Sequence, residues 1–271
     1  MVRSLWTAAT GMIAQQTNVD TIANNLANVN TQGYKTQVNE FKSLLYQNIQ
    51  TETTSANGEN KPVGAQVGLG VRNASISSIF TQGNLVASES STAFAIDGKG
   101  FFAVRGEDGN TYYTRNGNLQ FTLAANGNML ATTDGLPVLS TAGNPIILGN
   151  NYIVSDITVG KDGSLYYPDA NENLQPIGIT IGVFQFNNPN GLEKMGESLY
   201  AVTAASGQAI NEATSNIVER STVVQGYLEG SNVQVVDEMV NMIVAQRAYE
   251  LNSKAITASD EMLQQANNLR R

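Results

Sequence analysis

Apolar residues near the start of the chain recur with helical spacing. A row of large apolar residues follows seven-residue intervals, with further apolar residues between them: Leu5, Met12, Val19 and Leu26, then Ala9, Ile22 and Val29. Because an α-helix has about 3.6 residues per turn, residues seven apart share one helix face. The pattern predicts an amphipathic, heptad-like helix over residues 1–34, with Gly33 placed to end it in a left-handed turn.

The last forty residues predict a second and longer helix, over about 232–269. Residues 231–234 have the pattern of a capping box, acidic residues follow in the early turns, and two arginines close the segment. The apolar residues form three seven-spaced rows: Val235, Met242, Tyr249, Ile256 and Leu263; Val244, Leu251 and Ala258; Ala248, Ala255, Met262 and Leu269. At ~100° per residue, the first row lies well over 100° from the other two. Two separate apolar strips on one helix predict more than one neighbour.

Between these segments, over about 66–205, the apolar period changes to two. Short β-branched and aromatic runs alternate with Asp-Gly and Asn-Gly pairs, which is typical of short strands joined by tight turns. The predicted strands span 101–105, 111–114, 118–122, 129–132, 152–159, 164–167 and 177–186. The middle of the chain is therefore predicted to be an all-β domain.

The predicted fold class is α+β, with long terminal helices packed together around the ends of a central all-β domain. The predicted organisation is a helical polymerisation domain over 1–34 and 226–271, connectors over 35–65 and 206–225, and the β domain over 66–205. Residues 47–66 are so polar that an extended or partner-ordered loop is expected. On periodicity alone, the helices form either a hairpin within one chain or contacts between copies. The two apolar strips favour contacts between copies, and helices without those partners are expected to be poorly ordered.

Composition removes most catalytic chemistry. The 271 residues include no histidine and no cysteine, which excludes Ser-His-Asp and Cys-His nucleophiles, imidazole or thiolate metal sites, and disulfides. The net charge of −8 argues against binding to nucleic acid, and no apolar run approaches the ~18 residues of a membrane span. Asp97, Asp108 and Asp134 each precede a glycine, which favours a role in turns over a pair of glycosidase acids. No catalytic, cofactor-binding or metal-binding residue is predicted.

Longer motifs resemble a known family. Residues 23–35, Ala-Asn-Asn-Leu-Ala-Asn-Val-Asn-Thr-Gln-Gly-Tyr-Lys, resemble the N-terminal signature of the bacterial flagellar basal-body rod and hook proteins. Residues 229–233, 238–243, 246–254 and 260–263 are similar to the C-terminal end of the same family, and further matches lie at 66–72, 79–85, 96–102 and 113–117. The resemblance is strongest to the distal-rod members of this family.

The resemblance implies a structural, non-enzymatic subunit that assembles into a rigid hollow helical tube. Such a tube transmits motor torque to the hook and carries exported subunits. The implied partners are other copies of the chain, adjacent proximal-rod and hook proteins, ring bushing proteins of the envelope, and the flagellar export apparatus. The implied location is the basal body, crossing the periplasm, reached by export without a cleaved signal peptide. The segment 47–66 resembles the rod-specific insertion that bridges subunits.

The assembly contacts are expected from the apolar rows and the polar residues beside them. These residues are Leu5, Met12, Val19, Ile22, Asn24, Asn25, Leu26, Asn28, Val29, Met242, Arg247, Tyr249, Leu251, Ile256, Met262 and Leu263. The asparagine amides either bridge neighbouring backbones or are simply solvated. Two other functions stay open on the sequence: a hook or proximal-rod subunit of the same family, and a secreted β-domain adhesin or glycan-active protein with the helices as a stalk.

Overall fold

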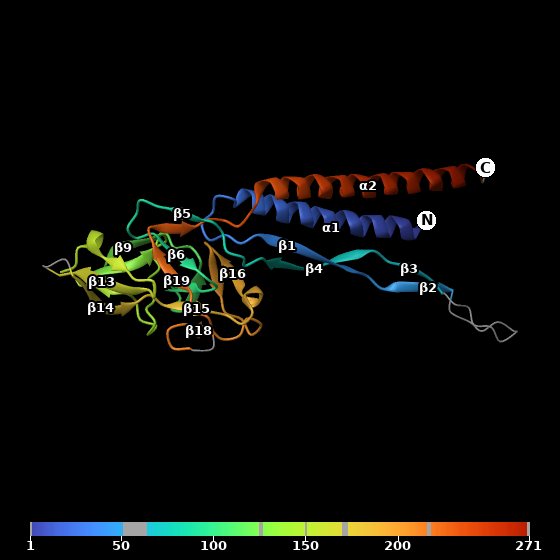
Figure 1. Ribbon diagram of the computed structural model, residues 1–271. Coiled ribbons are helices and arrows are strands. Elements are labelled where there is room, and N and C mark those ends of the chain that lie inside the picture. Colours follow the sequence, from blue (N-terminus) through green and yellow to red (C-terminus); the bar gives the residue numbers. More distant parts are fainter. Residues whose placement is uncertain are drawn as a thin grey trace. The chain divides into compact units, whose positions relative to one another are not determined.

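The computed structural model describes residues 2–50, 64–124, 127–149, 151–169, 173–215 and 218–269, and the chain divides into two compact units (Figure 1). The helical unit contains residues 1–27, 37–78 and 234–271, and the β unit contains residues 28–36 and 79–233. The chain therefore crosses between the units four times, after residues 27, 36, 78 and 233.

Two long helices, α1 (Val2–Ala27) and α2 (Val235–Asn268), pack against each other in the helical unit (Figure 1). This confirms the predicted pairing of the terminal helices. Helix α1 is shorter than predicted and ends at Ala27. Gly33 does adopt a left-handed φ of 69°, but it lies six residues beyond the end of the helix.

The start of α2 differs from the predicted capping box. Gln234 takes the N-cap position and makes no side-chain capping hydrogen bond. Ser231 instead accepts a hydrogen bond from the backbone of Val233, outside the helix. The predicted acidic residues Asp237 and Glu238 do occupy the first turn, where they favour the helix dipole. The two closing arginines lie outside the described residues.

The rest of the helical unit is a long antiparallel ribbon in two sections. The first section pairs β1 (Gln37–Ser43) with β4 (Val71–Ser78), and the second pairs β2 (Tyr46–Gln50) with β3 (Ala65–Gly68). Helix α1 packs on β1 and β4. Both ends of the segment predicted as a loop, 47–66, are thus strands, because cross-strand pairing satisfies the backbone groups of these polar residues. The remainder, 51–63, lies outside the described residues.

The β unit is built from antiparallel sheets. The largest has the order β16-β17-β8-β7-β15-β18, formed by β16 (Glu193–Gly196), β17 (Leu199–Ala201), β8 (Thr111–Thr114), β7 (Phe101–Arg105), β15 (Val183–Gln185) and β18 (Ile210–Asn211). Two three-stranded sheets comprise β11 (Ile147–Leu148), β10 (Gly127–Thr132) and β9 (Leu119–Ala124), and β12 (Thr158–Val159), β13 (Ser164–Pro168) and β14 (Leu174–Thr180). Two further pairs join β6 (Phe94–Asp97) to β19 (Thr222–Gln225) and β5 (Leu85–Ala87) to β20 (Tyr227–Glu229). Two short 3₁₀ helices, Val154–Asp156 and Pro189–Gly191, complete the elements.

Strand β7 explains how this core is organised. Its side chains alternate between two buried clusters: Phe102 and Val104 enter the larger cluster, while Phe101 and Ala103 enter a smaller aromatic one that includes Tyr200. Because both faces of β7 are covered, its sequence is a continuous apolar run rather than an alternating one. The β core therefore lies on both sides of this central strand.

Most predicted strands are present. The predictions for 101–105 and 111–114 coincide with β7 and β8, and those for 118–122, 129–132 and 164–167 lie within two residues of β9, β10 and β13. The prediction for 152–159 is wrong over most of its length, because residues 154–156 form a 3₁₀ helix. The prediction for 177–186 is wrong as a single strand. Strand pairing is interrupted between β14 and β15, where Gly182 lies. The Gly182 N–H donates to the Leu139 carbonyl, and a Cβ added to Gly182 would lie 2.8 Å from that carbonyl oxygen.

Candidate assembly surface

Helices α1 and α2 meet along a seam of small and polar residues. Three contacts define it: Ser4 with Ser259, Gly11 with Asn252, and Asn25 with Glu238. The two serine hydroxyls are 3.2 Å apart, and the Asn25 amide donates to the Glu238 carboxylate at 3.3 Å. A Cβ added to Gly11 would lie 2.8 Å from the Asn252 amide nitrogen. Both sets of positions are spaced by multiples of seven and run in opposite directions, so the helices form an antiparallel heptad pair.

The predicted apolar row of α1 is displaced from this seam by one residue. Leu5, Met12, Val19 and Leu26 are all half-buried, and the seam positions are the residues immediately before the first two and the last of them. Of the predicted apolar residues within α1, Ile22 is the most buried, at 5% exposed. Small side chains at the seam let the two backbones approach, so hydrophobicity alone did not identify it.

A second face of α1 packs on the β1–β4 ribbon. The Thr10 hydroxyl accepts a hydrogen bond from the Val71 N–H of β4 at 3.4 Å. The Asn25 amide also bonds the backbone of Gln37 through both its nitrogen and its oxygen. Helix α1 is therefore covered on two sides within one chain.

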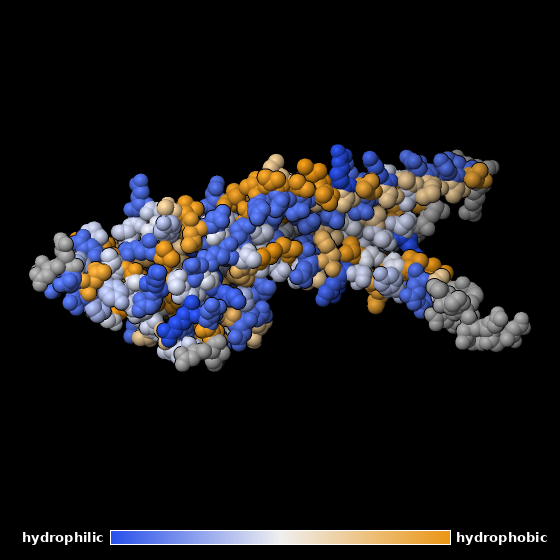
Figure 2. Space-filling model, viewed as in Figure 1, coloured by the Kyte–Doolittle hydropathy of each residue, from blue (hydrophilic) through white to orange (hydrophobic). Residues whose placement is uncertain are grey.

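Helix α2 is covered on one side alone. Of its described residues only Glu238, Ala245 and Ser259 are buried. Its large apolar residues on the remaining surface are half or more exposed: Val236, Met239, Val240, Ile243, Val244, Leu251 and Met262. Figure 2 shows hydrophobic surface gathered along the first half of α2. A continuous exposed apolar face of this kind marks an interaction surface.

The structure divides the predicted interface residues into three groups. Ile22 and Asn25 are buried; Leu5, Met12, Val19, Leu26, Asn28, Val29, Met242, Ile256 and Leu263 are half-buried; Asn24, Arg247, Tyr249, Leu251 and Met262 are exposed. Asn28 and Val29 follow the end of α1 and belong to the β unit, so they do not share a helix face with the others.

Sequence reasoning missed the apolar residues of the first turns of α2. Val236, Met239, Val240 and Ile243 are all exposed, and they add about two turns to the surface on which Val244 and Leu251 lie. The sequence carries a signal for them, because apolar residues occupy most positions in this part of the helix.

Two other exposed features accompany this surface. Arg247 forms a hydrogen-bonded ion pair with Glu250 at 3.0 Å, with side chains 74% and 53% exposed. An exposed pair of this type contributes roughly 0–1 kcal/mol, so it leaves Arg247 accessible to a partner. The ribbon also exposes large apolar side chains, among them Leu45, Tyr46 and Ile49.

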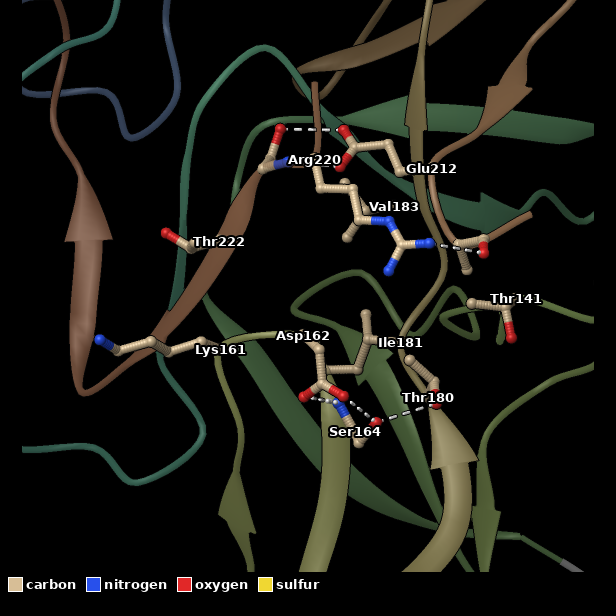
Figure 3. A pocket seen from close by; sticks show the side chains of 12 residues that line it. Thr141, Lys161, Asp162, Ser164, Thr180, Ile181, Val183, Glu212, Arg220 and Thr222 are labelled. Atoms are coloured by element: carbon tan, nitrogen blue, oxygen red, sulfur yellow. Dashed lines mark hydrogen bonds between the residues drawn. The ribbon is translucent and has the colours of Figure 1, made fainter. Parts of the chain in front are cut away.

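The β unit contains a cavity of about 380 Å³, drawn in Figure 3. The Glu212 carboxylate at its wall accepts hydrogen bonds from the Ser221 N–H and hydroxyl, at 2.6 and 2.9 Å, and from the Gln185 amide. Asp162 accepts from both the backbone and hydroxyl of Ser164, and these hydrogen bonds lower the pKa of the Asp162 carboxyl. Both carboxylates are thus engaged in turns and loop closure.

One of the predicted turn aspartates, Asp108, is engaged in the same way. Asp108 accepts hydrogen bonds from the Tyr112 hydroxyl at 2.8 Å and from Asn110, and these bonds lower the pKa of its carboxyl. A glycosidase acid needs a raised pKa. Within the described ranges, no three metal-binding side chains of the His, Cys, Asp or Glu type come together, and neither described helix has the length and apolarity of a membrane span.

Comparisons with known proteins agree with this arrangement of helices and strands. Residues 5–35 match the family described as "Flagella basal body rod protein", residues 95–167 match "Flagellar hook protein FlgE/F/G D1 domain", and residues 224–269 match "Flagellar basal body rod FlgEFG protein C-terminal". The first and last matches coincide with α1 and α2.

Full-length relatives give the same result. The chain is 44% identical to "Flagellar basal-body rod protein FlgG" of Borreliella burgdorferi over 274 residues, covering all of both chains. It is 43% identical to the protein of the same name from Buchnera aphidicola subsp. Schizaphis graminum, covering 99% of this chain and all of the relative. A "Flagellar hook-basal body complex protein FlhP" of Bacillus subtilis is 33% identical over 289 residues. The chain therefore belongs to the flagellar basal-body rod family, as a structural, non-enzymatic subunit of the distal-rod type.

Proposed function

We propose that this subunit polymerises with other copies of itself through the outer face of α2, forming a rigid hollow tube that transmits torque to the hook and carries exported subunits. The observation that supports the proposal is the exposed apolar face of α2, which includes Val240, Val244 and Leu251 and stays exposed after α1 has covered the opposite side. An apolar helix face is stabilised when another surface removes it from water, by roughly 25 cal/mol for each Å² buried.

The geometry of the unit favours an open polymer. The exposed apolar face of α2 extends over several turns. Helix α1 exposes two other large apolar residues, Trp6 and Ile13, so the two helices offer different apolar surfaces. Contacts between two different surfaces of identical copies are heterologous, and heterologous contacts that do not close produce helical filaments. The relatives of 43% and 44% identity carry the word rod in their names, which agrees with such a polymer.

The proposed assembly contacts combine predicted and newly found residues. The contacting surface comprises the half-buried and exposed members of the predicted set in the helical unit, together with Val236, Met239, Val240, Ile243 and Val244. We further propose a functional division into a polymerisation domain over 1–34 and 226–271, a β domain over 66–205, and connectors over 35–65 and 206–225. The two compact structural units have other bounds, because residues 37–78 belong to the helical unit and residues 206–225 to the β unit.

The finer assignments of partner and place are also part of this proposal. The ends of the tube contact proximal-rod and hook proteins, its outer surface turns within the envelope ring proteins, and its subunits arrive through the flagellar export apparatus. The tube crosses the periplasm, and the subunit reaches it without a cleaved signal peptide.

The test compares charged substitutions on two faces of α2. Leu251→Asp places a carboxylate on the exposed apolar face, and Ser253→Asp places the same charge at an exposed position about 200° around the helix. Each variant replaces the wild-type protein in cells, and swimming and isolated basal bodies are examined. We expect Leu251→Asp, and likewise Val244→Asp, to abolish rod assembly while Ser253→Asp preserves it, with equal thermal stability of the three purified chains. Normal rods in the Leu251→Asp and Val244→Asp cells would refute the proposed surface.

A further inference from the structure

A group of three ionised side chains lies buried in the β unit. The Glu229 carboxylate contacts the Lys35 ammonium at 2.6 Å and the Arg115 guanidinium at 3.2 Å. The three residues are 1%, 1% and 2% exposed. Burial lowers the pKa of Lys35 and of Arg115, and the nearby Glu229 charge opposes that change in both. The carboxylate thus offsets part of the cost of burying two cations.

The cluster also bonds backbone groups. Lys35 donates to the Thr81 carbonyl at 2.8 Å, and Arg115 donates to the Gly98 carbonyl at 2.8 Å. The Glu229 carboxylate also accepts from the Gly83 N–H at 3.1 Å. The side chains therefore connect segments that are far apart in the sequence.

Asn232 forms a second link beside this cluster. Its amide oxygen accepts hydrogen bonds from the Thr36 N–H at 2.7 Å and the Thr36 hydroxyl at 2.8 Å. Its amide nitrogen donates to the Ile79 carbonyl at 2.8 Å and to both the carbonyl and the hydroxyl of Thr81. One side chain thus joins three separate stretches of backbone within the β unit.

Those stretches are the places where the chain leaves the β unit. Thr36 is the last residue before one crossing, Ile79 is the first after another, and Asn232 precedes the crossing after residue 233. The backbone reinforces the arrangement, because the Ile79 N–H donates to the Thr36 carbonyl at 2.8 Å and the Gly33 N–H donates to the Glu229 carbonyl at 2.8 Å. These hydrogen bonds tie segment 28–36 to the stretch that begins at Ile79 and to the stretch around Glu229.

We propose that Glu229 and Asn232 are positioning residues for assembly: with Lys35 and Arg115 they form an internal anchor that fixes the chain where it leaves the β unit. This inference rests on the proposed assembly function. Because the charged members are at most 2% exposed, they do not contact a neighbouring subunit in this fold, and their effect on assembly is exerted through the chain segments that they hold.

The motifs that suggested the family acquire a physical role from this anchor. Lys35 ends the N-terminal motif 23–35, Thr81 and Gly83 belong to 79–85, Arg115 belongs to 113–117, and Glu229 and Asn232 belong to 229–233. Five residues from four separate motifs, with Asn232 beside them, meet inside one unit of one chain. These motif residues therefore act within the subunit rather than on its surface.

The test uses the full chain with Asn232→Ala and Glu229→Gln, and with Asn84→Ala as an exposed control from the same region. Hydrogen exchange of the purified monomer is measured in peptides covering 28–36, 79–84 and 227–233, and in β-core peptides covering 101–105 and 137–148. Rod assembly is then scored in cells. We expect at least ten-fold faster exchange in the three anchor peptides of both variants, unchanged exchange in the β-core peptides, and loss of rods. Asn84→Ala is expected to behave as wild type.

Two results would overturn the proposal. Unchanged exchange in the anchor peptides of both variants would show that the side chains do not hold these segments. Equal acceleration in the anchor and β-core peptides would show that the cluster is simply part of the β core. Since exchange is measured on the monomer, this outcome is independent of Leu251→Asp, which tests the assembly surface itself.

Discussion

The Asn25 side-chain amide binds both polar groups of the Gln37 backbone. Its nitrogen donates to the Gln37 carbonyl at 2.8 Å, and its oxygen accepts from the Gln37 N–H at 2.9 Å. The same nitrogen lies 3.3 Å from the Glu238 carboxylate of α2. A single residue of α1, 1% exposed, therefore contacts the first residue of β1 and the first turn of α2. The sequence left two roles open for the asparagines, bridging of backbone groups or simple solvation, and Asn25 bridges backbone groups.

Replacing Asn25 should destabilise the helical unit, and by an amount that depends on the replacement. Asn25→Ala leaves both backbone groups of Gln37 without their partner, which we expect to cost about 2–4 kcal/mol. Asn25→Asp loses the donor and places a second carboxylate beside Glu238, so it should be more destabilising at neutral pH.

The measurement is urea unfolding followed by circular dichroism at 222 nm, because both described α-helices belong to the helical unit. Asn24→Ala, at an exposed position of the same turn, is the control and should change stability little. If Asn25→Ala matched Asn24→Ala, the amide bridge would not stabilise the unit. If Asn25→Asp were as stable as Asn25→Ala at pH 7, repulsion from Glu238 would be negligible.

A buried amide without a partner predicts a stabilising substitution. Asn39 of β1 is 7% exposed, and neither its amide nitrogen nor its amide oxygen has a hydrogen-bond partner among the described residues. An unsatisfied buried polar group costs about 1–3 kcal/mol, and valine has a higher strand propensity than asparagine. Asn39→Val should therefore raise the unfolding free energy of the helical unit by about 1–3 kcal/mol in the same urea experiment. A decrease in stability would indicate that a bound water satisfies the amide.

The helix seam shows where sequence reasoning reached its limit. Hydrophobic spacing correctly predicted two terminal helices, but it selected the row of Leu5 and Met12, whereas the seam uses Ser4 and Gly11. Hydrophobicity identifies residues that need covering, and in a subunit that assembles these include residues that its own chain does not cover. The residues of the internal seam are small and polar, so they gave no hydrophobic signal.

The β unit was predicted better because its core is internal. The residues of β7 and β8 are covered by their own chain, so their pattern and their burial agree. The anchor around Glu229 was not predictable, since it joins residues separated by as many as 196 positions and depends on the finished fold. Gly182, between β14 and β15, was a local signal that the predicted strand 177–186 is interrupted. The alternation of apolar residues obscured this signal.

The phenol of Tyr200 predicts a loss of stability in alkali. Burial raises the pKa of Tyr200 to about 12, against an ordinary value near 10. Between these values the folded chain keeps the proton while the unfolded chain loses it, so stability is complete below pH 10 and falls as the pH rises through 12. The contribution of this one group reaches at most about 1.4 kcal/mol per pH unit.

Urea unfolding from pH 9 to pH 12, followed by near-ultraviolet circular dichroism of the aromatic cluster around Tyr200, measures this dependence. Tyr200→Phe should unfold with a shallower pH dependence than the wild type, whereas Tyr227→Phe, at a position 40% exposed, should retain the wild-type slope. If the unfolding free energies of the wild type and Tyr200→Phe fell with the same pH dependence, groups other than Tyr200 would cause the loss of stability in alkali.

The polar seam predicts that the two helices are weakly protected before assembly. Only three described residues of the 34-residue α2 are buried, and the seam contacts include a serine pair and a glycine against an asparagine. Burial of so little apolar surface gives the pair little stability of its own, because most helical stability comes from tertiary packing. In the purified chain we expect amides of α1 and α2 to exchange at least a hundred-fold faster than those of β7 and β10.

Asn252→Leu, which adds an apolar side chain to the seam beside Gly11, should slow exchange in both helices and leave the β unit unchanged. Helices as well protected as β7 in the wild-type monomer would mean that the hairpin is stable by itself, and assembly would then proceed by docking of preformed helices rather than by their ordering.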